Sequence, residues 1–328
     1  MSKRSGALAE SLSDRESDQM SDRKSNRNSD RTQTSWLSKI EPALYLTPFL
    51  IGIIVFTLYP VINVIVISFM EDYNYLTRSF SQFGLDNYKS VLGNKYFMQA
   101  LSNTFIYVLS VVPLATCIAL VVANLLNQKL KLSGLFQTAY FLPMVTSVTA
   151  VGLAWRFMFN ERLGIINFFL SLLRIDPIGW LTKAEWSMPA LVIYGIWNIL
   201  PFTIILLLAG LQGVNPMFYT AARVDGSKGL RIFFRITVPL LAPTIMLTTI
   251  VNTISAFKVF NELFPLFKGQ AGPFYNLYTV VYFIYEQMAG KPRLGRAASA
   301  ALVLFAVIFV LTMIQLLIQR KWNRSGRV

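Results

Sequence analysis

Long apolar blocks, separated by short polar segments, dominate the chain after about residue 38. Each block runs for about 23 to 26 residues, which as an α-helix is about 35 Å long and crosses a hydrocarbon layer of roughly 30 Å with some tilt. We therefore predict an all-α, polytopic membrane protein with six transmembrane helices. The predicted spans are Leu44–Phe69, Thr104–Leu126, Leu135–Phe159, Met188–Leu211, Leu240–Glu262 and Ala297–Gln319.

Prolines interrupt several of these spans. Each proline removes one backbone hydrogen bond and tends to kink a helix, and neighbouring helices in a bundle can compensate for the loss. Kinked helices occur in transporters and in static bundles alike, so the prolines alone do not decide the function. They are Pro60, Pro113, Pro143, Pro201 and Pro243.

Residues 1–38 differ from the rest of the chain in composition. They are rich in Ser, Asp, Arg, Lys, Asn and Gln and contain few apolar side chains. Such a segment buries too little surface to offset the entropy of ordering, so we predict a disordered tail. It lacks the apolar stretch and cleavage site of a signal peptide. We expect residues 39–328 to form one six-span transmembrane domain.

Composition narrows the possible functions. Of the 328 residues 54% are hydrophobic and 14% are charged, with one cysteine and no histidine. A soluble domain has about a quarter charged residues, so the composition also indicates a membrane protein. An intramolecular disulfide is impossible, and zinc sites or catalysis that depend on histidine are excluded. A phosphate-binding GxxxxGK[ST] motif is absent from the sequence.

The net charge of +14 is better explained by membrane orientation than by nucleic-acid binding. Of the 30 Lys and Arg residues, 18 lie in the N-terminal segment before the first span, in the loops after the second and fourth spans, and at the C-terminal end. Short cytoplasmic segments carry the basic excess in membrane proteins. We therefore predict that both termini are cytoplasmic and that the protein lies in a bacterial cytoplasmic membrane.

The loop after the fourth span, residues 213–239, has a pattern of two short helices joined by a turn. Pro216 precedes a helix-favouring stretch, and Gly226 can adopt the positive φ that reverses the chain. A second short helix is predicted over Leu230–Ile236, and Pro239 is predicted to begin the fifth span. We expect a compact, rigid projection into the cytoplasm, because two short helices fixed by a glycine turn transmit force better than a flexible loop.

In its spacing this loop resembles the EAA loop of permease subunits in ATP-binding cassette (ABC) importers. The family pattern is Glu-Ala-Ala, three residues, Gly, nine residues, Ile, one residue and Leu-Pro. Thr220 replaces the Glu and Val238 replaces the Leu, while the other marked positions match. The resemblance implies that the loop receives force from an ATPase, through Thr220, Ala221, Ala222, Asp225, Gly226, Ile236 and Pro239.

Further segments between about residues 40 and 320 resemble the carbohydrate-uptake branch of this family, which includes the larger permease subunits of maltose, multiple-sugar and glycerol-phosphate systems. They are Phe83–Tyr88, Asn103-Thr104, Phe141-Leu142-Pro143, Trp155, Gly164–Asn167, Gly269–Pro273 and Gly295–Ala300. The resemblance implies the MetI-like fold of type I ABC importers and a permease that provides half of the pathway for a sugar, moved by alternating access.

The resemblance also implies partners. They are a second homologous permease, two copies of a cytoplasmic ATPase and an extracytoplasmic sugar-binding protein. ATP and Mg would be bound by the ATPase, and this chain would be neither an enzyme nor the holder of a cofactor or metal. An oligosaccharide is the expected substrate, and glycerol phosphate or another anionic sugar derivative is the alternative.

Polar residues at the end of the fifth span are the candidates for the sugar path. Phe257 and Asn261 are one helical turn apart, and Lys258 is adjacent. An aromatic ring covers the apolar face of a sugar, and an amide both donates to and accepts from hydroxyls. The alternative is structural, with Lys258 extending to the membrane surface or pairing with Glu262.

Three other interpretations are weaker. Tyr194, Trp197 and Asn198 in the fourth span are also sugar-path candidates, but interfacial Tyr and Trp are common, and belt anchoring is likewise the simpler interpretation of Trp155 and Arg156. An ion-coupled secondary transporter usually has internal repeats and carboxylates deep in its spans, and the sequence shows neither. A membrane-embedded enzyme would need the clustered carboxylates or metal-ligand spacing that the sequence lacks.

Overall fold

The computed structural model describes residues 36–128, 144–290 and 292–325, together with three single positions between 128 and 144. It divides into two compact units, residues 1–64 and residues 65–328. The predicted tail of residues 1–38 lies outside the described residues apart from Trp36–Ser38, which already belong to a helix.

The described part of the first unit is one apolar helix. It comprises α2 (Trp36–Ile53), the π-turn η1 (Ile54–Leu58) and α3 (Tyr59–Phe69), whose last residues continue into the second unit. Its membrane-spanning stretch, Leu44–Phe69, has a mean hydropathy of 2.6 and coincides with the predicted first span. The π-turn ends two residues before Pro60. Proline has no N–H to donate, so it would interrupt the hydrogen bonds of a regular α-helix, and the wider turn lies where that interruption falls.

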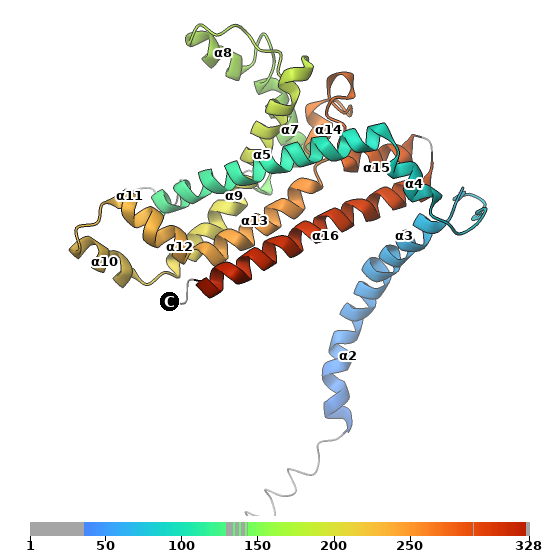
Figure 1. The fold of residues 1–328 in the computed structure, drawn as a ribbon, viewed down its shortest axis with the longest axis horizontal. Helices are drawn as coiled ribbons and strands as arrows, with labels where there is room; N and C mark the ends of the chain where they lie inside the picture. Colours follow the sequence, from blue (N-terminus) through green and yellow to red (C-terminus); the bar gives the residue numbers. More distant parts are fainter. Residues whose placement is uncertain are drawn as a thin grey trace, which may run out of the picture. The chain divides into compact units, whose positions relative to one another are not determined.

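Four longer helices form the body of the second unit: α5 (Lys95–Leu126), α9 (Ala184–Gln212), α13 (Ala242–Phe257) and α16 (Leu294–Ser325). α5 packs against α9, and α13 packs against α5, α9 and α16 (Figure 1). Pro113 in α5 and Pro201 in α9 lie inside continuous helices.

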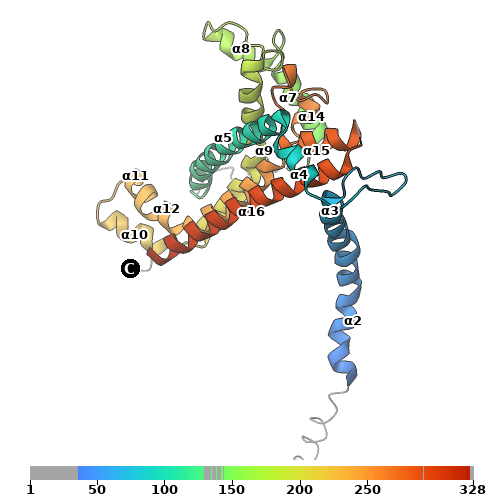
Figure 2. The same cartoon turned by 45° about the vertical axis from the view of Figure 1, so that its right-hand side comes forward.

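Shorter helices cluster at the ends of this bundle. The segments α10 to α12 lie at one end of α16, and α4 and α15 lie at the opposite end (Figures 1 and 2). Their bounds are α4 Asp86–Leu92, α7 Val148–Met158, α8 Ile165–Leu172, α10 Pro216–Val224, α11 Gly229–Ile232, η2 Phe233–Thr237, α12 Val238–Leu240, α14 Leu263–Leu266, η3 Pro273–Tyr275 and α15 Val280–Ala289.

Small residues on α5 allow close helix packing. Ala119 and Ala123 are fully buried, and they pack with Ile204, Leu207 and Leu211 of α9 in a compact apolar cluster. Small side chains let helix backbones approach closely, which is how helices associate in membranes. A larger apolar cluster joins the first half of α5 to α9, α15 and the segment that follows α13.

The predicted set of six spans is confirmed only in part. Four helices of the described chain are long and apolar enough to cross a membrane, and a fifth span requires that a bent pair be taken as one. The third predicted span begins outside the described residues, and its described part is the 11-residue helix α7. The second, fourth and sixth spans correspond to α5, α9 and α16.

The start of the fifth span differs from the prediction. Pro239 lies inside α12, and the membrane helix α13 begins at Ala242 after a bend of 69°. Hydrogen bonds from Leu241 N to Thr237 O (3.0 Å) and from Ile245 N to Leu241 O (2.9 Å) continue across the bend. Pro239 and Pro243 donate no backbone hydrogen bond, so the chain bends between these two prolines instead of beginning a straight helix.

The end of the fifth span also differs. α13 ends at Phe257, five residues before the predicted end at Glu262, and the chain turns at Lys258. Phe257 and Val259 are both buried, and the Thr279 hydroxyl donates to the Val259 carbonyl at 3.1 Å. Contacts with a distant segment therefore replace the helix that local sequence predicted.

Candidate functional site: a two-helix loop and a pocket around Asn261

The 213–239 loop folds as a helix, a glycine turn and a second helix. Asn215 caps α10 through its side-chain oxygen, which accepts from Met217 N at 2.9 Å, and Pro216 occupies the first turn. At the other end of α10, Ser227 N donates to Ala222 O at 2.9 Å. Gly226 has a φ of +73°, as this type of helix end requires. The predicted glycine turn is confirmed.

Several apolar side chains of this loop are exposed. Met217, Val224 and Leu230 are 75%, 82% and 77% exposed. Thr220, Ala221 and Asp225 are exposed as well, whereas Ala222 is buried. Exposed apolar groups on a rigid projection are typical of a surface that another protein covers. Ile236 is half-buried and Pro239 is exposed at the following bend.

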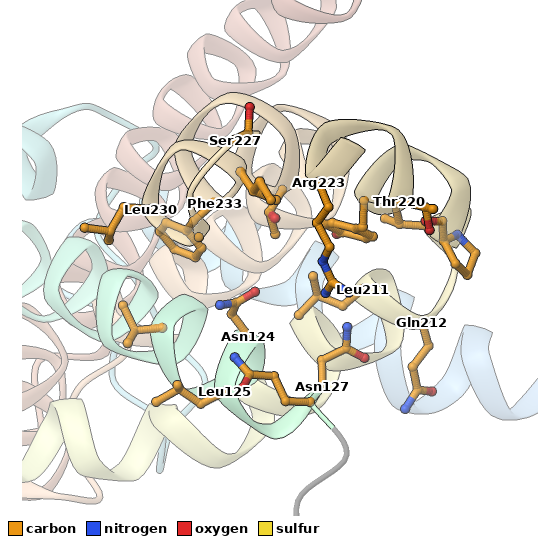
Figure 3. A pocket seen from close by; sticks show the side chains of 18 residues that line it. Asn124, Leu125, Asn127, Leu211, Gln212, Thr220, Arg223, Ser227, Leu230 and Phe233 are labelled. Carbon is orange, nitrogen blue, oxygen red and sulfur yellow. The ribbon is translucent and has the colours of Figure 1, made fainter. Parts of the chain in front are cut away.

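A cavity of about 1030 Å³ separates this loop from the ends of α5 and α9. It is lined by Asn124 and Asn127 of α5, by Gln212, and by Tyr219 and Arg223 of α10. In Figure 3 the Arg223 side chain extends from α10 toward the helix ends. α10 is therefore joined to the bundle through its flanking segments, while the cavity lies beneath it.

Two asparagines, Asn167 buried and Asn103 half-buried, fix loops away from the 213–239 loop. The Asn167 amide donates to Glu161 O (3.0 Å) and Ile178 O (2.9 Å), and its oxygen accepts from Ile178 N (3.2 Å) and Trp180 Nε1 (2.9 Å). The Asn103 amide donates to the carbonyls of Asn276 (2.8 Å) and Tyr278 (3.0 Å). Asn103 and Asn167, which both belong to segments that resemble the family, therefore stabilise these loops.

The Phe83–Tyr88 segment is fixed in the same way. The Asn87 amide donates to Ser68 O (3.2 Å) and Met70 O (2.8 Å), and the buried Glu71 carboxylate accepts from Asp86 N (3.2 Å). Gly84 leaves room for that carboxylate, because a Cβ at this position would overlap with it. These bonds connect the end of α3 to the start of α4.

The candidate sugar-path residues do not form the expected helical stripe. Phe257 is fully buried, and its ring packs edge-on against Phe105 at 5.3 Å. Lys258 and Asn261 are exposed. Asn261 lines a pocket of about 440 Å³, whereas Phe257 and Lys258 do not. The structure therefore brings Asn261 to a possible ligand site and places Phe257 in the core.

A buried polar contact lies close to this region. The Asn198 amide of α9 donates to Glu262 Oε1 at 3.3 Å, and Glu262 Oε2 accepts from Phe260 N at 3.3 Å. Burial raises the pKa of the Glu262 carboxyl, which lies beyond the end of α13, and the backbone hydrogen bonds act in the opposite direction. Tyr194 and Trp155 are buried within the protein, so belt anchoring at a membrane surface does not describe them.

Sequence reasoning missed the aromatic cluster around Asn261. The rings of Phe260 and Phe264 lie 5.6 Å apart, and Tyr285 of α15 lies 5.1 Å from Phe260. The four-residue spacing of the two phenylalanines is visible in the sequence, but Tyr285 joins them only through the fold. Arg156 and Lys268, which line the same pocket, come from α7 and the turn after α14.

The architecture is that of a polytopic, all-α membrane protein with a rigid two-helix projection at one end of its helix bundle. Residues 90–324 match the family described as binding-protein-dependent transport system inner membrane component. The chain belongs to this family, whose members are permease subunits of ABC importers.

Two curated relatives cover nearly the whole chain. The arabinooligosaccharides transport system permease protein AraP of Halalkalibacterium halodurans is 32% identical over 291 residues, covering 88% of this chain and 90% of AraP. The lactose transport system permease protein LacF of Rhizobium radiobacter is 33% identical over 276 residues, covering 83% of this chain and 91% of LacF.

The fold is also similar to a solved structure. A chain of the bacterial alginate ABC transporter, solved in complex with an alginate pentasaccharide-bound periplasmic protein, superposes with a TM-score of 0.73. The match covers 89% of this chain and 99% of that chain at 23% identity. At this identity the likeness concerns the fold.

Proposed function

We propose that this protein is the permease subunit of an ATP-driven, binding-protein-dependent sugar importer and forms half of the translocation pathway. The observation that carries the proposal is the rigid 213–239 loop, in which Gly226 reverses the chain between two helices and leaves apolar side chains exposed. The names of the relatives AraP and LacF, which transport arabinooligosaccharides and lactose, support an oligosaccharide as the substrate.

The proposed mechanism is alternating access. ATP binding closes two cytoplasmic ATPase subunits around this loop and its counterpart in a second permease. Because α10 is a short, capped helix, its displacement is passed on to α9 and, through α12, to α13. The bundle then opens toward the outside, and sugar enters from the extracytoplasmic binding protein. ATP hydrolysis, with Mg bound on the ATPase, then closes the cavity to the outside and opens it to the cytoplasm.

The orientation follows from this role. The 213–239 loop faces the cytoplasm, so the opposite end of the bundle, with α4 and α15, faces outward. Both termini are then cytoplasmic, in agreement with the distribution of Lys and Arg. The binding protein docks on the outward loops, among them those held by Asn167 and Asn103.

Asn261 is the strongest of the three sugar-path candidates, because it is exposed in a pocket beside three aromatic rings. Lys258 remains a candidate at the exposed end of α13. Phe257 acts indirectly, by fixing the end of α13 against α5. Glycerol phosphate and other anionic sugar derivatives are the alternative substrates.

Transport by the complete complex tests this proposal. The permease, its partner permease, the ATPase and the binding protein are reconstituted in proteoliposomes, and uptake is measured across a panel of neutral and acidic oligosaccharides. Uptake of at least one saccharide that requires both ATP and binding protein is expected. Uptake by this chain alone, driven by an ion gradient, would instead indicate a secondary transporter.

A further inference from the structure

Two adjoining pockets share a pair of cationic side chains. The pocket of about 440 Å³ around Asn261 and a second pocket of about 500 Å³ are both lined by Arg156 and Lys268. The second pocket continues past Trp180 toward the loop after α7. Together the two pockets form one groove, which we name the Arg156–Lys268 groove.

The groove has few carboxylates to neutralise these cations. No Asp or Glu lines the pocket around Asn261, and Glu161 is the one acidic residue that lines the larger pocket. Glu161 accepts a hydrogen bond from the Thr182 hydroxyl at 3.2 Å. Among the described residues Lys89 forms an ion pair with Asp86, whereas Arg156 and Lys268 form none with a described carboxylate. Arg156 is half-buried, a position in which an uncompensated charge is costly.

The backbone holds Lys268 in an unusual conformation. Lys268 has a φ of +58° and Gly269 a φ of +79°, in a left-handed turn that side chains rarely adopt. The turn is fixed by hydrogen bonds from Gly269 N to Phe264 O (2.7 Å) and from the Tyr282 hydroxyl to Gly269 O (3.0 Å). Strained positions of this kind concentrate where a side chain is presented to a ligand.

The two elements that carry the cations are packed tightly together. Gly152 on α7 lies against the Pro265 ring of α14, and a Cβ at residue 152 would overlap with that ring. Arg156 follows Gly152 by one helical turn, and Lys268 follows α14. Close packing of α7 on α14 therefore fixes the relative position of the two cations, as a binding site for a defined anion requires.

Aromatic rings also line the groove. Phe260, Phe264 and Tyr285 lie within 5.1 to 6.0 Å of one another, centroid to centroid. Such rings cover the apolar face of a sugar, while Asn261 offers a donor and an acceptor to its hydroxyls. A guanidinium binds a carboxylate through two parallel hydrogen bonds, and an ammonium adds a point charge.

We propose that the Arg156–Lys268 groove binds an acidic saccharide, with the carboxylate of a uronate unit between Arg156 and Lys268 and its ring against Phe260, Phe264 and Tyr285. This inference rests on the proposed function as a sugar permease and specifies the substrate class. It replaces the interpretation of Arg156 as a membrane-interface anchor.

A direct binding measurement distinguishes recognition of the carboxylate charge from recognition of the sugar ring. The complete complex is placed in nanodiscs of neutral lipid and titrated calorimetrically with a tetramer of galacturonic acid and with its methyl ester, which has the same ring skeleton without the charges. The acid is expected to bind about 10-fold tighter than the ester or more, since charge-assisted hydrogen bonds are the stronger class. Arg156→Gln and Lys268→Gln should each reduce this preference, and together they should bring the ratio close to 1.

Arg174→Gln is the matched control, because Arg174 is an exposed cation with a φ of +60° that lines neither pocket. Its acid-to-ester ratio should equal that of the parent. Lys268→Gly removes the charge and relieves the backbone, so it should lower the ratio without loss of thermal stability.

Three outcomes would overturn the proposal. Equal binding of acid and ester by the parent would show that the cations do not select the substrate. An acid preference that survives both glutamine substitutions would place the anion site elsewhere. An acid preference that is lost when anionic lipid is added would assign the cations to lipid headgroups. In each case ATP-dependent uptake of a neutral sugar would leave the proposed function intact, whereas absence of uptake for every saccharide would contradict that function too.

Discussion

The 213–239 loop and the segment after α13 both connect helices in this protein, and they are held by different kinds of contact. In the loop, the fixing bonds span two to five residues, as in Met217 N to the Asn215 side chain and Ser227 N to Ala222 O. After α13, the Thr279 hydroxyl bonds to Val259 O across 20 residues, and Val280 N bonds to the Thr104 hydroxyl across 176.

The difference indicates how each region can move. A segment fixed by its own local bonds moves as one body when a partner, here the proposed ATPase, displaces it. A segment fixed by distant partners changes only when the helices that carry those partners shift against each other. The loop is therefore suited to receive a movement, and the segment after α13 is suited to respond to a rearrangement of α5, α9 and α15.

The largest effect is expected from breaking the glycine turn of the loop. Gly226→Val places a β-branched residue at a φ of +73°, which is strongly disfavoured even though no atom lies within 4 Å of the added Cβ. We expect uptake by reconstituted complex to fall at least about 5-fold, since distortion costs about 1–2 kcal/mol or more. Uptake per inserted complex and copurification of the ATPase measure the effect.

Gly229→Ala serves as the control for this variant. Gly229 lies in the same loop, also has open space around it, and lacks a positive φ. It should transport like the parent. Normal ATP-dependent uptake by Gly226→Val would show that the turn does not couple ATP hydrolysis to transport.

A second prediction concerns distant contacts. Asn167→Ala removes five hydrogen bonds and leaves Ile178 N and Trp180 Nε1 without their partner. Two unsatisfied buried groups cost about 2–4 kcal/mol, so thermal unfolding should begin at a clearly lower temperature. The fluorescence of Trp180 should report the change. Asn74→Ala, which affects an exposed turn bonded only to nearby residues, should cost about 1 kcal/mol or less.

A third prediction distinguishes the exposed Asn261 from the buried Phe257 at the end of α13. Asn261→Ala removes a polar partner of the sugar, which costs about 1–3 kcal/mol, or roughly 5- to 150-fold in affinity. Protein level and basal ATPase activity should stay normal, and the substrate dependence of uptake measures the loss. Phe257→Leu, a milder change in the core, should affect thermal stability more than substrate affinity. If Phe257→Leu instead lowered substrate affinity more than thermal stability, Phe257 would be assigned to the sugar path.

The comparison also explains what the sequence could predict. The helix bounds of α10 and the Gly226 turn follow from local signals, namely a capping Asn215, Pro216 in the first turn and a glycine after the helix. The first membrane span can be predicted equally well from the sequence, because a continuous apolar stretch of sufficient length is recognised without knowledge of the fold.

The end of α13 could not be predicted in this way. Residues Phe257–Glu262 contain no proline or glycine, so nothing local ends the helix there. It ends because Phe257, Val259 and Leu263 are all buried and because Thr279 binds the Val259 carbonyl. Tyr285 likewise joins the ring of Phe260 only because the fold brings distant segments together. The same holds for Arg156 and Lys268, which line one pocket but lie far apart in the chain.

The smallest effect is expected at Thr220, one of the two positions where the loop departs from the family pattern. Thr220 is exposed on α10, and its hydroxyl bonds only to Pro216 O at 3.3 Å, within the same helix. Thr220→Glu introduces a better helix former and a carboxylate three residues before Arg223, which stabilises a helix by about 0.2–0.5 kcal/mol. Uptake should therefore stay within about twofold of the parent. In the Arg223→Gln background the gain in thermal stability should disappear, because the cation is missing. A large loss of uptake in Thr220→Glu would mean that the ATPase surface facing α10 carries negative charge, and that this loop has adapted to a partner different from that of the Glu-containing permeases.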